Sequence, residues 1–550
     1  MSNKVTYLPL GGAGSVTLNM HVFETDHDIV IFDAGIGFPD TDQFGVDVVI
    51  PDTTYLESRR HKIRGIVISH SHEDHIGGLP YLLKNLGNPP IYATKLARAF
   101  IQNKLSEHNM VSGQALNEIF PETTIIHLGD FTITPYRVNH SVPDALGLFI
   151  HTPAGNIVYS PDFKFDWTPV DGVLFEVGKL SKLIEPGVAI LLSDCLGANR
   201  EGYTESERMI QKVFEDAIAV TKGQVFITTM SSNISRMQQA INASFKHGRK
   251  VIPVGRSIDQ NIQTAINLGY LTIPNDIVIS IEESRRIPPH KATYIIAGSF
   301  GQKGSALDRL SRGENRQIRI KENATVIFSA DPIPGVYDQV ALVVDNLIAL
   351  GANVIYSDIQ DNVHVSGHGS RGDLSMMAGI VRPKYFIPIG GEIRHQRGYR
   401  DMVTNMGFKE ESVFELAGGQ AVNLVDGEAS LGEKIEIKSV FVDGGLVGDV
   451  GTTVLKERMQ LASEGVIVIV VRKDKDQFNV NVDIDSRGFV FKSGNDKLMQ
   501  DIYRFTKKII AGRKVNEWNK AKEELDKKIS NFIYQQIKRK PLVLPVLVNA

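Results

Sequence analysis

The chain of 550 residues contains a single cysteine, Cys195. One cysteine excludes a framework of intrachain disulfides, and such sparing use is typical of proteins in the reducing cytoplasm. Cys195 follows the apolar run AILLSD, so we interpret it as a small buried packing residue and not as a catalytic thiol. The chain also lacks a signal-peptide pattern at its start and any apolar run of the roughly 18 to 20 residues that a membrane helix needs. We therefore predict a cytoplasmic protein with no membrane partner.

The chain has little net charge, with a formal value of −3, and its 42% hydrophobic and 22% charged residues are an ordinary globular balance. An imbalance is found only locally, because residues 501–550 hold 12 Lys and Arg against 5 Asp and Glu. Two interpretations of this stretch stay open: a solvated helical face, or a surface for phosphate contacts or assembly. At roughly 150 residues per domain, the length predicts three or four domain-sized units.

The pattern of apolar runs changes along the chain. The first 200 residues alternate short strand-like runs with turns, and residues 147–162 form a clear hairpin pattern around a turn at 153–156. From about Thr204, strand-like and helix-like segments alternate, which predicts a parallel sheet covered by helices. After about Leu431 we expect a further small α/β unit that includes a basic helical stretch near 498–540.

The strongest functional signal is the segment SHSHEDH, which contains His70, His72, Asp74 and His75. It follows the apolar run GIVIS, and two residues that are two apart in an extended segment point to the same side. Three imidazoles and a carboxylate at a strand-to-helix turn suit two metal ions about 3.5 to 4 Å apart, which activate water for hydrolysis. One histidine at a strand end is usually a surface residue, but this density predicts a metal centre.

Three more polar residues follow apolar strands. His140 ends the run FTITPYRVN, and Asp162 ends the run NIVYSP. Alone, either would be interpreted as a turn residue, but beside the histidine cluster both are candidate ligands, and Asp162 can bridge two metals. We expect Asp33, which ends IVIFD, to orient a ligand instead of binding metal itself.

In their order, these residues resemble the ligand motifs of the metallo-β-lactamase superfamily, which begin with H-x-H-x-D-H. More narrowly, nearly the whole chain resembles the ribonuclease J family of the β-CASP branch. The supporting segments are Leu10–Asn19, Gly35–Asp52, Leu192–Asp194, Ser231–Gln239, Gly255–Ser257, Ile333–Gly335, His364–Gly369, Ser486–Phe489 and the ending KRKPLVLPV.

The resemblance implies an α/β fold in which an αββα metallo-β-lactamase sandwich is split by an inserted β-CASP α/β domain. A small α/β C-terminal domain follows. The expected boundaries are 1–203 and 356–435 for the two parts of the metallo-β-lactamase domain, 204–355 for the β-CASP domain and 436–550 for the C-terminal domain.

The resemblance also implies an activity. It predicts a metal-dependent hydrolase of single-stranded RNA that acts as a 5′-to-3′ exonuclease and as an endonuclease, in mRNA decay and rRNA maturation. The expected cofactor is two Zn²⁺ ions, with Mn²⁺ or Mg²⁺ as alternatives. Family members assemble as cytoplasmic homodimers or homotetramers through the C-terminal domain, which favours the assembly interpretation of the basic stretch.

Site residues follow from the same resemblance. Metal ligands are expected at His70, His72, Asp74, His75, His140 and Asp162, and Asp74 and Asp162 also hold the attacking water. A glycine-containing turn with a hydroxyl and two imidazoles can hold a phosphate oxyanion, and His368 in it is expected to protonate the leaving oxygen. Ser231, Ser232 and Asn233 would add contacts before a helix, although helix capping is the alternative. The turn consists of His364, Val365, Ser366, Gly367 and His368.

The sequence departs from the family where a ligand histidine usually stands, because the segment PIGGE carries Gly390 there. The second metal would keep Asp74, His75 and Asp162 but lose one donor, for which His395 is a conceivable substitute. Three accounts stay open: a weaker second metal, a single metal, or a paralogue of low activity that mainly binds RNA or joins a hetero-oligomer. We favour residual activity, and a nuclease acting on DNA is a further alternative. Ser15, Ser235 and Phe300 also replace residues common in the family, namely Glu, His and Gln.

Overall fold

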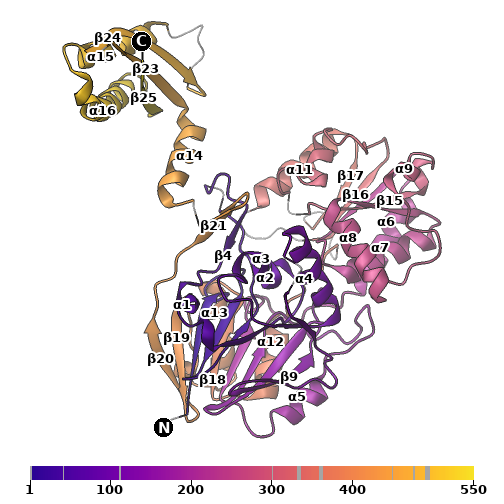
Figure 1. The fold of residues 1–550 in the computed structure, drawn as a ribbon. Coiled ribbons are helices and arrows are strands. Elements are labelled where there is room, and N and C mark those ends of the chain that lie inside the picture. The colour runs from indigo at the N-terminus through magenta and orange to yellow at the C-terminus, as the bar shows by residue number, and fades with distance from the viewer. Residues whose placement is uncertain are drawn as a thin grey trace. The chain divides into compact units, whose positions relative to one another are not determined.

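The computed structural model describes residues 3–40, 42–110, 113–299, 301–330, 336–357, 363–448, 450–474, 477–489 and 496–549 (Figure 1). Some residues named in the sequence analysis lie outside these ranges: Phe300, the segment Ile333–Gly335, and Thr41 of the segment Gly35–Asp52. The chain forms two compact units, one of Met1–Phe38 with Val49–Val440 and one of Pro39–Val48 with Phe441–Ala550. No helix in the described ranges is both long and apolar enough to cross a membrane.

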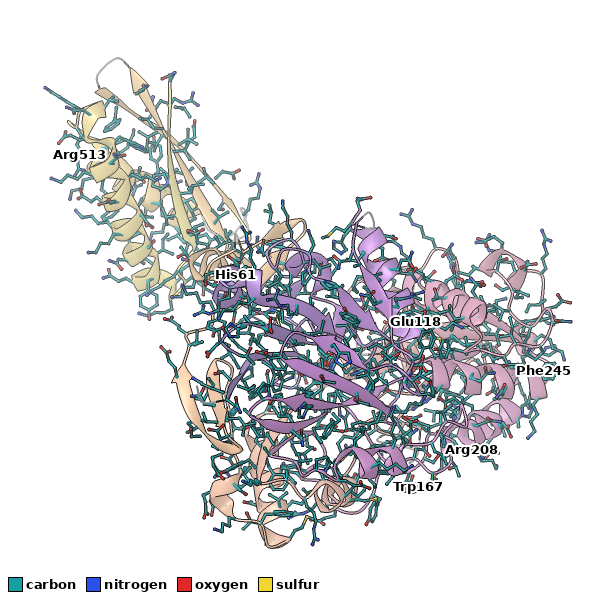
Figure 2. All side chains as sticks on the ribbon, turned by 60° about the horizontal axis from the view of Figure 1, so that its bottom comes forward. His61, Glu118, Trp167, Arg208, Phe245 and Arg513 are labelled. Atoms are coloured by element: carbon teal, nitrogen blue, oxygen red, sulfur yellow. The ribbon has the colours of Figure 1, made fainter. Side chains whose placement is uncertain are left out.

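Two sheets pack face to face in the first unit. One has the strand order β20-β19-β1-β2-β3-β5-β6-β7 and the other β18-β12-β11-β10-β9-β8, and apolar side chains from both fill the layer between them (Figure 2). The first sheet contains β1 (Lys4–Gly11), β2 (Met20–Glu24), β3 (Ile29–Phe32), β5 (Ile63–Val67), β6 (Ile91–Ala93), β7 (Leu116–Glu118), β19 (Gln420–Val425) and β20 (Glu428–Lys434). Four helices occur between the strands of this sheet in the sequence: the short α1 (Thr54–Glu57), α2 (Glu73–Ile76) and α3 (Leu79–Leu82) and the longer α4 (Lys95–Glu107).

The second sheet carries helices on its outer face. Its strands are β8 (Ile126–Leu128), β9 (Phe131–Arg137), β10 (Leu146–Thr152), β11 (Gly155–Ser160), β12 (Ile190–Asp194) and β18 (Tyr385–Ile389). Apolar residues of α5 (Val177–Leu183), α12 (Arg371–Val381) and α13 (Ile393–Asn405) pack on it. The predicted hairpin is confirmed as β10 and β11, which pair antiparallel. Strands β11, β12 and β18 run parallel, so their carboxyl ends meet at one edge.

The segment inserted between β12 and β18 has a parallel sheet of its own, with the order β14-β15-β13-β16-β17. Its strands are β13 (Val225–Thr228), β14 (Lys250–Val254), β15 (Ala292–Ile296), β16 (Thr325–Phe328) and β17 (Asn353–Ile355). The helices of this segment are α6 (Met209–Val220), α7 (Ile234–Lys246), α8 (Arg256–Leu268), α9 (Ile281–Ser284), α10 (Ala306–Ser311) and α11 (Tyr337–Ala349). Continuous apolar strands are expected when both faces of a parallel sheet are covered, and the predicted parallel sheet is confirmed.

The second unit is built on a three-stranded sheet in which β23 (Val466–Asp474) pairs antiparallel with β24 (Gln477–Arg487) and parallel with β25 (Leu542–Asn549). Helices α15 (Asp496–Ile510) and α16 (Trp518–Ile537) bury one face of this sheet. The helical stretch predicted near 498–540 is therefore two helices, separated at Gly512, whose φ of 75° ends the first one. Strands β21 (Val440–Asp443) and β22 (Leu446–Val447) and helix α14 (Thr452–Glu464) precede the sheet, and β4 (Val48–Ile50) lies earlier in the chain.

Candidate metal centre

The residues of the SHSHEDH segment lie where β5 ends and α2 begins. His72 is the residue before α2 and has an extended backbone, with φ −70° and ψ 153°, and its carbonyl accepts from the backbone N–H groups of His75 and Ile76. His70, His72 and His75 are all at least 95% buried. The turn therefore directs the imidazoles inward, to the edge where the strands of both sheets end.

Four of the predicted ligands meet in what we call the first cluster: His70, His72, His140 and Asp162. One donor atom from each lies within 4.8 Å of the others. The His72 Nδ1 atom is 3.1 Å from both His70 Nε2 and His140 Nε2, and Asp162 Oδ2 is 3.6 Å from those same two nitrogens. Three imidazole nitrogens and one carboxylate oxygen around one point match the four-donor set of a tetrahedral Zn²⁺ site.

The imidazoles of the first cluster are in the form that binds a metal. Burial lowers the pKa of His140 to about 4 and the pKa values of His70 and His72 well below their usual range. His140 Nδ1 donates to the Gly367 carbonyl at 2.8 Å, which leaves the lone pair on Nε2, the atom that faces the cluster. A neutral imidazole with a fixed tautomer is the state that metal coordination requires.

The second cluster consists of Asp74, His75 and Asp162. His75 Nε2 lies 3.4 Å from Asp162 Oδ2 and 3.6 Å from Asp74 Oδ2. Burial raises the pKa of Asp74 to about 6, while the pKa of His75 is raised above its usual value because three carboxylates outweigh its burial. Asp162 belongs to both clusters, as a bridging ligand would.

Asp33 lies beneath the second cluster and orients it. Its Oδ2 atom is 2.9 Å from His75 Nδ1 and accepts from Tyr159 Oη at 2.7 Å, and its two oxygens accept from the backbone N and Oγ of Ser69, each at 2.8 Å. This geometry agrees with the expected role of Asp33 as an orienting residue and not a ligand.

Gly390 directly follows β18, beside the shared ligand Asp162. Its φ is 65°, and its N–H donates to the Gly12 carbonyl at 2.8 Å. A Cβ atom at this position would meet nothing closer than Asp162 Oδ1 and Asp194 Oδ1, each at 3.8 Å. A Cβ here would thus face Asp162, the ligand shared by both clusters, and Asp194, and glycine leaves that space open. The first cluster fits a metal ion with four donors, whereas the second offers three.

Two other histidines are candidates to replace the missing donor. His395 lies in the first turn of α13, where its Nδ1 accepts from the Glu392 N–H at 3.1 Å and so caps the helix. His21, which the sequence analysis missed, is fully buried on β2, and its Nδ1 is 2.9 Å from Tyr7 Oη. Its Nε2 has no hydrogen-bond partner within the described part of the chain, and a Cβ on Gly12 would lie 2.9 Å from it. Neither histidine belongs to a described metal cluster.

His368 stands over both clusters. Its Nδ1 is 2.7 Å from Asp194 Oδ2, and its Nε2 is 3.8 Å from Asp162 Oδ2. Burial lowers the pKa of His368, but the carboxylates of Asp194 and Asp162 outweigh it and raise the value to about 9. The ring therefore carries a proton near neutral pH, beside the place where a metal would act. Asp194 entered the sequence analysis only as part of a matching segment, since no local pattern pairs it with a histidine 174 residues away.

Comparison with known proteins gives four matching family models. They are "Beta-lactamase superfamily domain" over 29–187, "Ribonuclease J, beta-CASP domain" over 222–347, "Zn-dependent metallo-hydrolase RNA specificity domain" over 352–413 and "Ribonuclease J C-terminal domain" over 453–550. The chain is 34% identical to ribonuclease J2 of Bacillus subtilis (strain 168) across 100% of this chain and 99% of that protein. It is 35% identical to ribonuclease J of Thermus thermophilus, across 99% of this chain and 95% of that protein.

The chain belongs to the ribonuclease J family. The predictions of this family and of a metallo-β-lactamase fold with inserted β-CASP and C-terminal domains are confirmed. A crystal structure of a protein of unknown function from Enterococcus faecalis V583 covers 78% of this chain and 100% of its own, with 14% identity and a TM-score of 0.54, and supports the fold alone. The family's hydrolase domains and the buried His and Asp clusters make the centre a metal-binding one.

The residues expected to contact phosphate in this ribonuclease J family member have local partners. Ser366 Oγ accepts from the His368 N–H and from Arg200 Nη2, each at 3.1 Å. Asn233 Oδ1 accepts from the Arg236 N–H at 2.9 Å and caps α7, which is the capping alternative. The Ser231 carbonyl accepts from an asparagine of α8, and Ser232 is buried. Val365 and Gly367 are buried in the turn, and His364 is half-buried.

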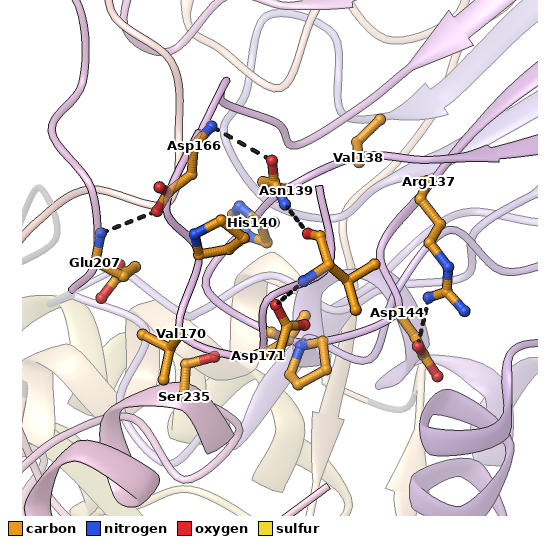
Figure 3. Close-up of a pocket in the computed structure, with 14 residues that line it drawn as sticks. Arg137, Val138, Asn139, His140, Asp144, Asp166, Val170, Asp171, Glu207 and Ser235 are labelled. Atoms are coloured by element: carbon orange, nitrogen blue, oxygen red, sulfur yellow. Dashed lines mark hydrogen bonds and ion pairs between the residues drawn. The ribbon is translucent and has the colours of Figure 1, made fainter. Parts of the chain in front are cut away.

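A small hollow lies beside the first cluster, with His140 in its lining (Figure 3). Its volume of about 20 Å³ has room for one or two water molecules. The Glu207 N–H donates to Asp166 Oδ2 at 3.0 Å, and the Asp166 N–H donates to Asn139 Oδ1 at 3.3 Å. Ser235 of α7 also lines it, so this lining joins the two-sheet core to the inserted segment.

Proposed function

We propose that this chain is a metal-dependent ribonuclease that hydrolyses RNA phosphodiesters, both from the 5′ end and internally, in mRNA decay and rRNA maturation. The observation that carries the proposal is the first cluster, a complete four-donor set, with the protonated His368 beside it. The relatives named ribonuclease J supply the substrate class. Single-stranded RNA is expected to bind mainly through its backbone, because a nuclease of broad sequence range cannot depend on base contacts.

His70, His72, His140 and Asp162 would hold the first metal ion, and Asp74, His75 and Asp162 the second. A bound metal supplies Lewis-acid activation of water and of the scissile phosphate. Zn²⁺ suits the nitrogen-rich first cluster, and Mn²⁺ or Mg²⁺ are the alternatives for a carboxylate-containing second one.

The remaining chemistry belongs to side chains. The carboxylates of Asp74 and Asp162 orient the attacking water. His368 Nε2 delivers its proton to the leaving oxygen, while Asp194 holds the opposite ring nitrogen at 2.7 Å. The Ser366 hydroxyl and the backbone N–H groups of the 364–368 turn contact a phosphate oxygen, and His364 lies in the same turn. We keep Ser231, Ser232 and Asn233 as further RNA contacts, with the cap at Asn233 as the competing role.

The experiment measures bound metal by mass spectrometry and the degradation of 5′-monophosphorylated RNA. We expect His72→Ala to lose the first metal and at least about 100-fold in turnover, since even residues that only orient metal ligands are worth 10- to 100-fold. His61→Ala is the matched control, because His61 is exposed on the surface. Unchanged activity in His72→Ala, or protein without metal that degrades RNA, contradicts the proposal, and a parallel DNA substrate tests the DNA alternative.

A second candidate function is a catalytically weak RNA-binding subunit of a larger ribonuclease J complex, and Gly390 favours it. Gly390→His tests the two candidates, because a Cβ at this position has open space towards Asp162. The φ of 65° strains any side chain there, so thermal unfolding is compared with that of Gly390→Ala, which carries the same strain without a donor atom. A weak enzyme should gain a second bound metal and turnover in Gly390→His. A subunit that only binds RNA should keep its RNA affinity and show no gain in turnover.

We further propose domain boundaries of 1–203 and 356–435 for the metallo-β-lactamase parts, 204–355 for the β-CASP domain and 436–550 for the C-terminal domain. Support comes from β12, the last strand of the first part, and β18, the first strand of the second part, which pair directly with each other. The single cysteine, which is buried, supports a cytoplasmic location.

We also propose a homodimer or homotetramer, or a hetero-oligomer with a paralogue, assembled through the C-terminal domain. On β23, the alternate residues Ile467, Ile469 and Val471 are buried under the helices, so Val466, Val468 and Val470 lie on the opposite face of the sheet. Leu544 of β25 pairs beside Val468 and is 42% exposed. On β24 the residues paired with these valines are Arg487, Asp485 and Asp483, so the aliphatic surface is confined to β23 and β25. Exposed aliphatic surface with a charged rim is typical of subunit contacts.

A further inference from the structure

Three ionisable side chains are buried together outside both metal clusters. Lys164 and Arg236 are fully buried, and Glu207 is 3% exposed. Arg236 Nη2 donates to Glu207 Oε2 at 2.6 Å, and Lys164 Nζ lies 3.6 Å from Glu207 Oε1. We call these residues the buried triad. Removing three charges from water costs free energy unless each is paired, so a structural or functional role for the triad is expected.

The triad joins two parts of the first unit. Lys164 comes two residues after the shared ligand Asp162, in the segment that follows β11. Glu207 lies just before α6, beside the hollow of Figure 3, and Arg236 lies in the first turn of α7. The carboxylate of Glu207 therefore sits between a cation of the metal-binding part and a cation of the inserted segment.

One cation of the triad bonds directly to the turn that carries His368, and the other acts through Ser329 on Val363, the residue before the turn. Lys164 Nζ donates to the Ser366 carbonyl at 3.1 Å. Arg236 Nη1 donates to the carbonyl and Oγ of Ser329, at 2.8 and 2.5 Å, and Ser329 Oγ donates onward to the Val363 carbonyl at 2.7 Å. The triad thus bonds directly to the Ser366 carbonyl of the turn. It bonds through Ser329 to the Val363 carbonyl, just before the turn.

The far end of the turn is held by groups outside the triad. Arg200 Nη2 and Thr204 Oγ1 donate to the His368 carbonyl at 3.3 and 2.8 Å, and His140 Nδ1 donates to the Gly367 carbonyl. The Gly369 N–H donates to the Phe163 carbonyl at 2.6 Å, and the Lys164 N–H donates to the Asn139 carbonyl at 2.8 Å. These backbone bonds survive any change of side chain. The carbonyls of Val363 and Ser366 depend on the triad's side chains, while Arg200 Nη2 donates separately to Ser366 Oγ at 3.1 Å.

We propose that Glu207, acting through Lys164 and Arg236, is a positioning residue that fixes the turn carrying Ser366 and His368 against Asp162. The inference rests on the proposed ribonuclease function, since it is in that reaction that Ser366 and His368 contact the phosphate. Glu207 itself belongs to neither metal cluster. Its charge keeps two buried cations in place: Lys164 holds the Ser366 carbonyl, and Arg236 holds the Val363 carbonyl through Ser329.

The first test is Glu207→Gln in the full-length protein. The amide keeps the shape and an oxygen for Arg236 but removes the charge that keeps both cations in position. We expect bound metal to stay at the unmodified level and kcat to fall by about 10- to 100-fold, because displacements near 1 Å cost that much. The KM for RNA should change less than about threefold.

The matched control is Glu215→Gln. Glu215 lies on α6 and pairs with Lys246 of α7, whose side chain is exposed. This variant therefore removes a Glu charge that pairs with α7, as Glu207 does, but it leaves the turn unchanged. It should keep the unmodified kcat. Hydrogen exchange gives the independent readout: the amides of 363–369 should exchange faster in Glu207→Gln than in the control.

A second variant is used in case Glu207→Gln does not fold. Lys164→Met with Glu207→Gln removes one cation together with the anion and leaves the Ser366 carbonyl without the Lys164 donor, while the bond from Arg200 to Ser366 Oγ stays. This protein should bind metal normally and show the same fast exchange and low kcat. The inference is overturned if either variant, with full metal, keeps kcat within twofold or keeps the exchange of 363–369 unchanged. If the unmodified protein degrades no RNA, the proposed function fails, and the exchange comparison still decides whether the triad positions the turn.

Discussion

Asp33 has a left-handed backbone, with φ 61°, and a fully buried carboxylate that meets Ser69, His75 and Tyr159. Aspartate tolerates this conformation better than most residues, and its two oxygens are both used. We expect Asp33→Asn to weaken binding of the second metal by about 10- to 100-fold while the first metal is retained, because an amide can no longer accept from all these donors.

Metal titration against a chelator measures this effect. Asp28→Asn is the control, since Asp28 is also a buried aspartate near β3 but pairs with Arg64. Equal affinity for the second metal in both variants would show that Asp33 does not orient His75.

At the scale of single residues, the sequence predicts side chains that stand at the ends of strands. His70, His72, His140 and Asp162 could be found in this way, because the carboxyl ends of neighbouring strands meet at one edge. Asp194 also ends a strand, β12, but its pairing with His368 could not be predicted, because 174 positions separate the two residues. His21 could not be found, because it lies within β2 and its environment depends on how the two sheets face each other.

Helix α7 provides a test at the scale of elements. Asn233 Oδ1 accepts from the N–H of Arg236, so Asn233→Ala should destabilise the protein by about 0.5 to 2 kcal/mol, the usual value of such a cap. Thermal unfolding measures the change, and Asn233→Asp should restore most of it. A fall in RNA affinity with no loss of stability would instead make Asn233 a substrate contact.

Elements were predictable where apolar residues alternate locally. The β10–β11 hairpin and the parallel sheet of the inserted segment are examples. The hairpin of β19 and β20 was missed, although its turn is Asp426-Gly427, with φ values of 49° and 84°, a strong hairpin signal. Strand β19 pairs with β1, which lies far away in the sequence, so no local pattern predicts this pairing.

Assembly is the prediction at the scale of the whole molecule. Leu544→Asp places a charge on the aliphatic face of the C-terminal sheet, so we expect the oligomer to dissociate to monomers in light scattering after gel filtration. Ile125→Asp is the control, because Ile125 is 55% exposed on the first unit. A dimer or tetramer that persists in Leu544→Asp would exclude this face as the contact.

The long insertion between β12 and β18 also limits what the sequence can predict. Asp194 and Ile389 are paired neighbours in the sheet, although they lie far apart in the chain. The sequence could indicate that Gly390 lacks a donor atom. Only the folded chain indicates how much space that glycine leaves, and which carboxylates border it.

That space has a practical consequence for anyone who purifies the protein. A Cβ atom at Gly390 would have room next to Asp162 and Asp194, and we expect a free imidazole to bind there in place of the absent side chain. We expect added imidazole to raise the occupancy of the second metal, and Gly390→His to abolish the effect. Protein eluted from a nickel column with imidazole should therefore differ in metal content from protein prepared by ion exchange, and equal content in both preparations would contradict this expectation.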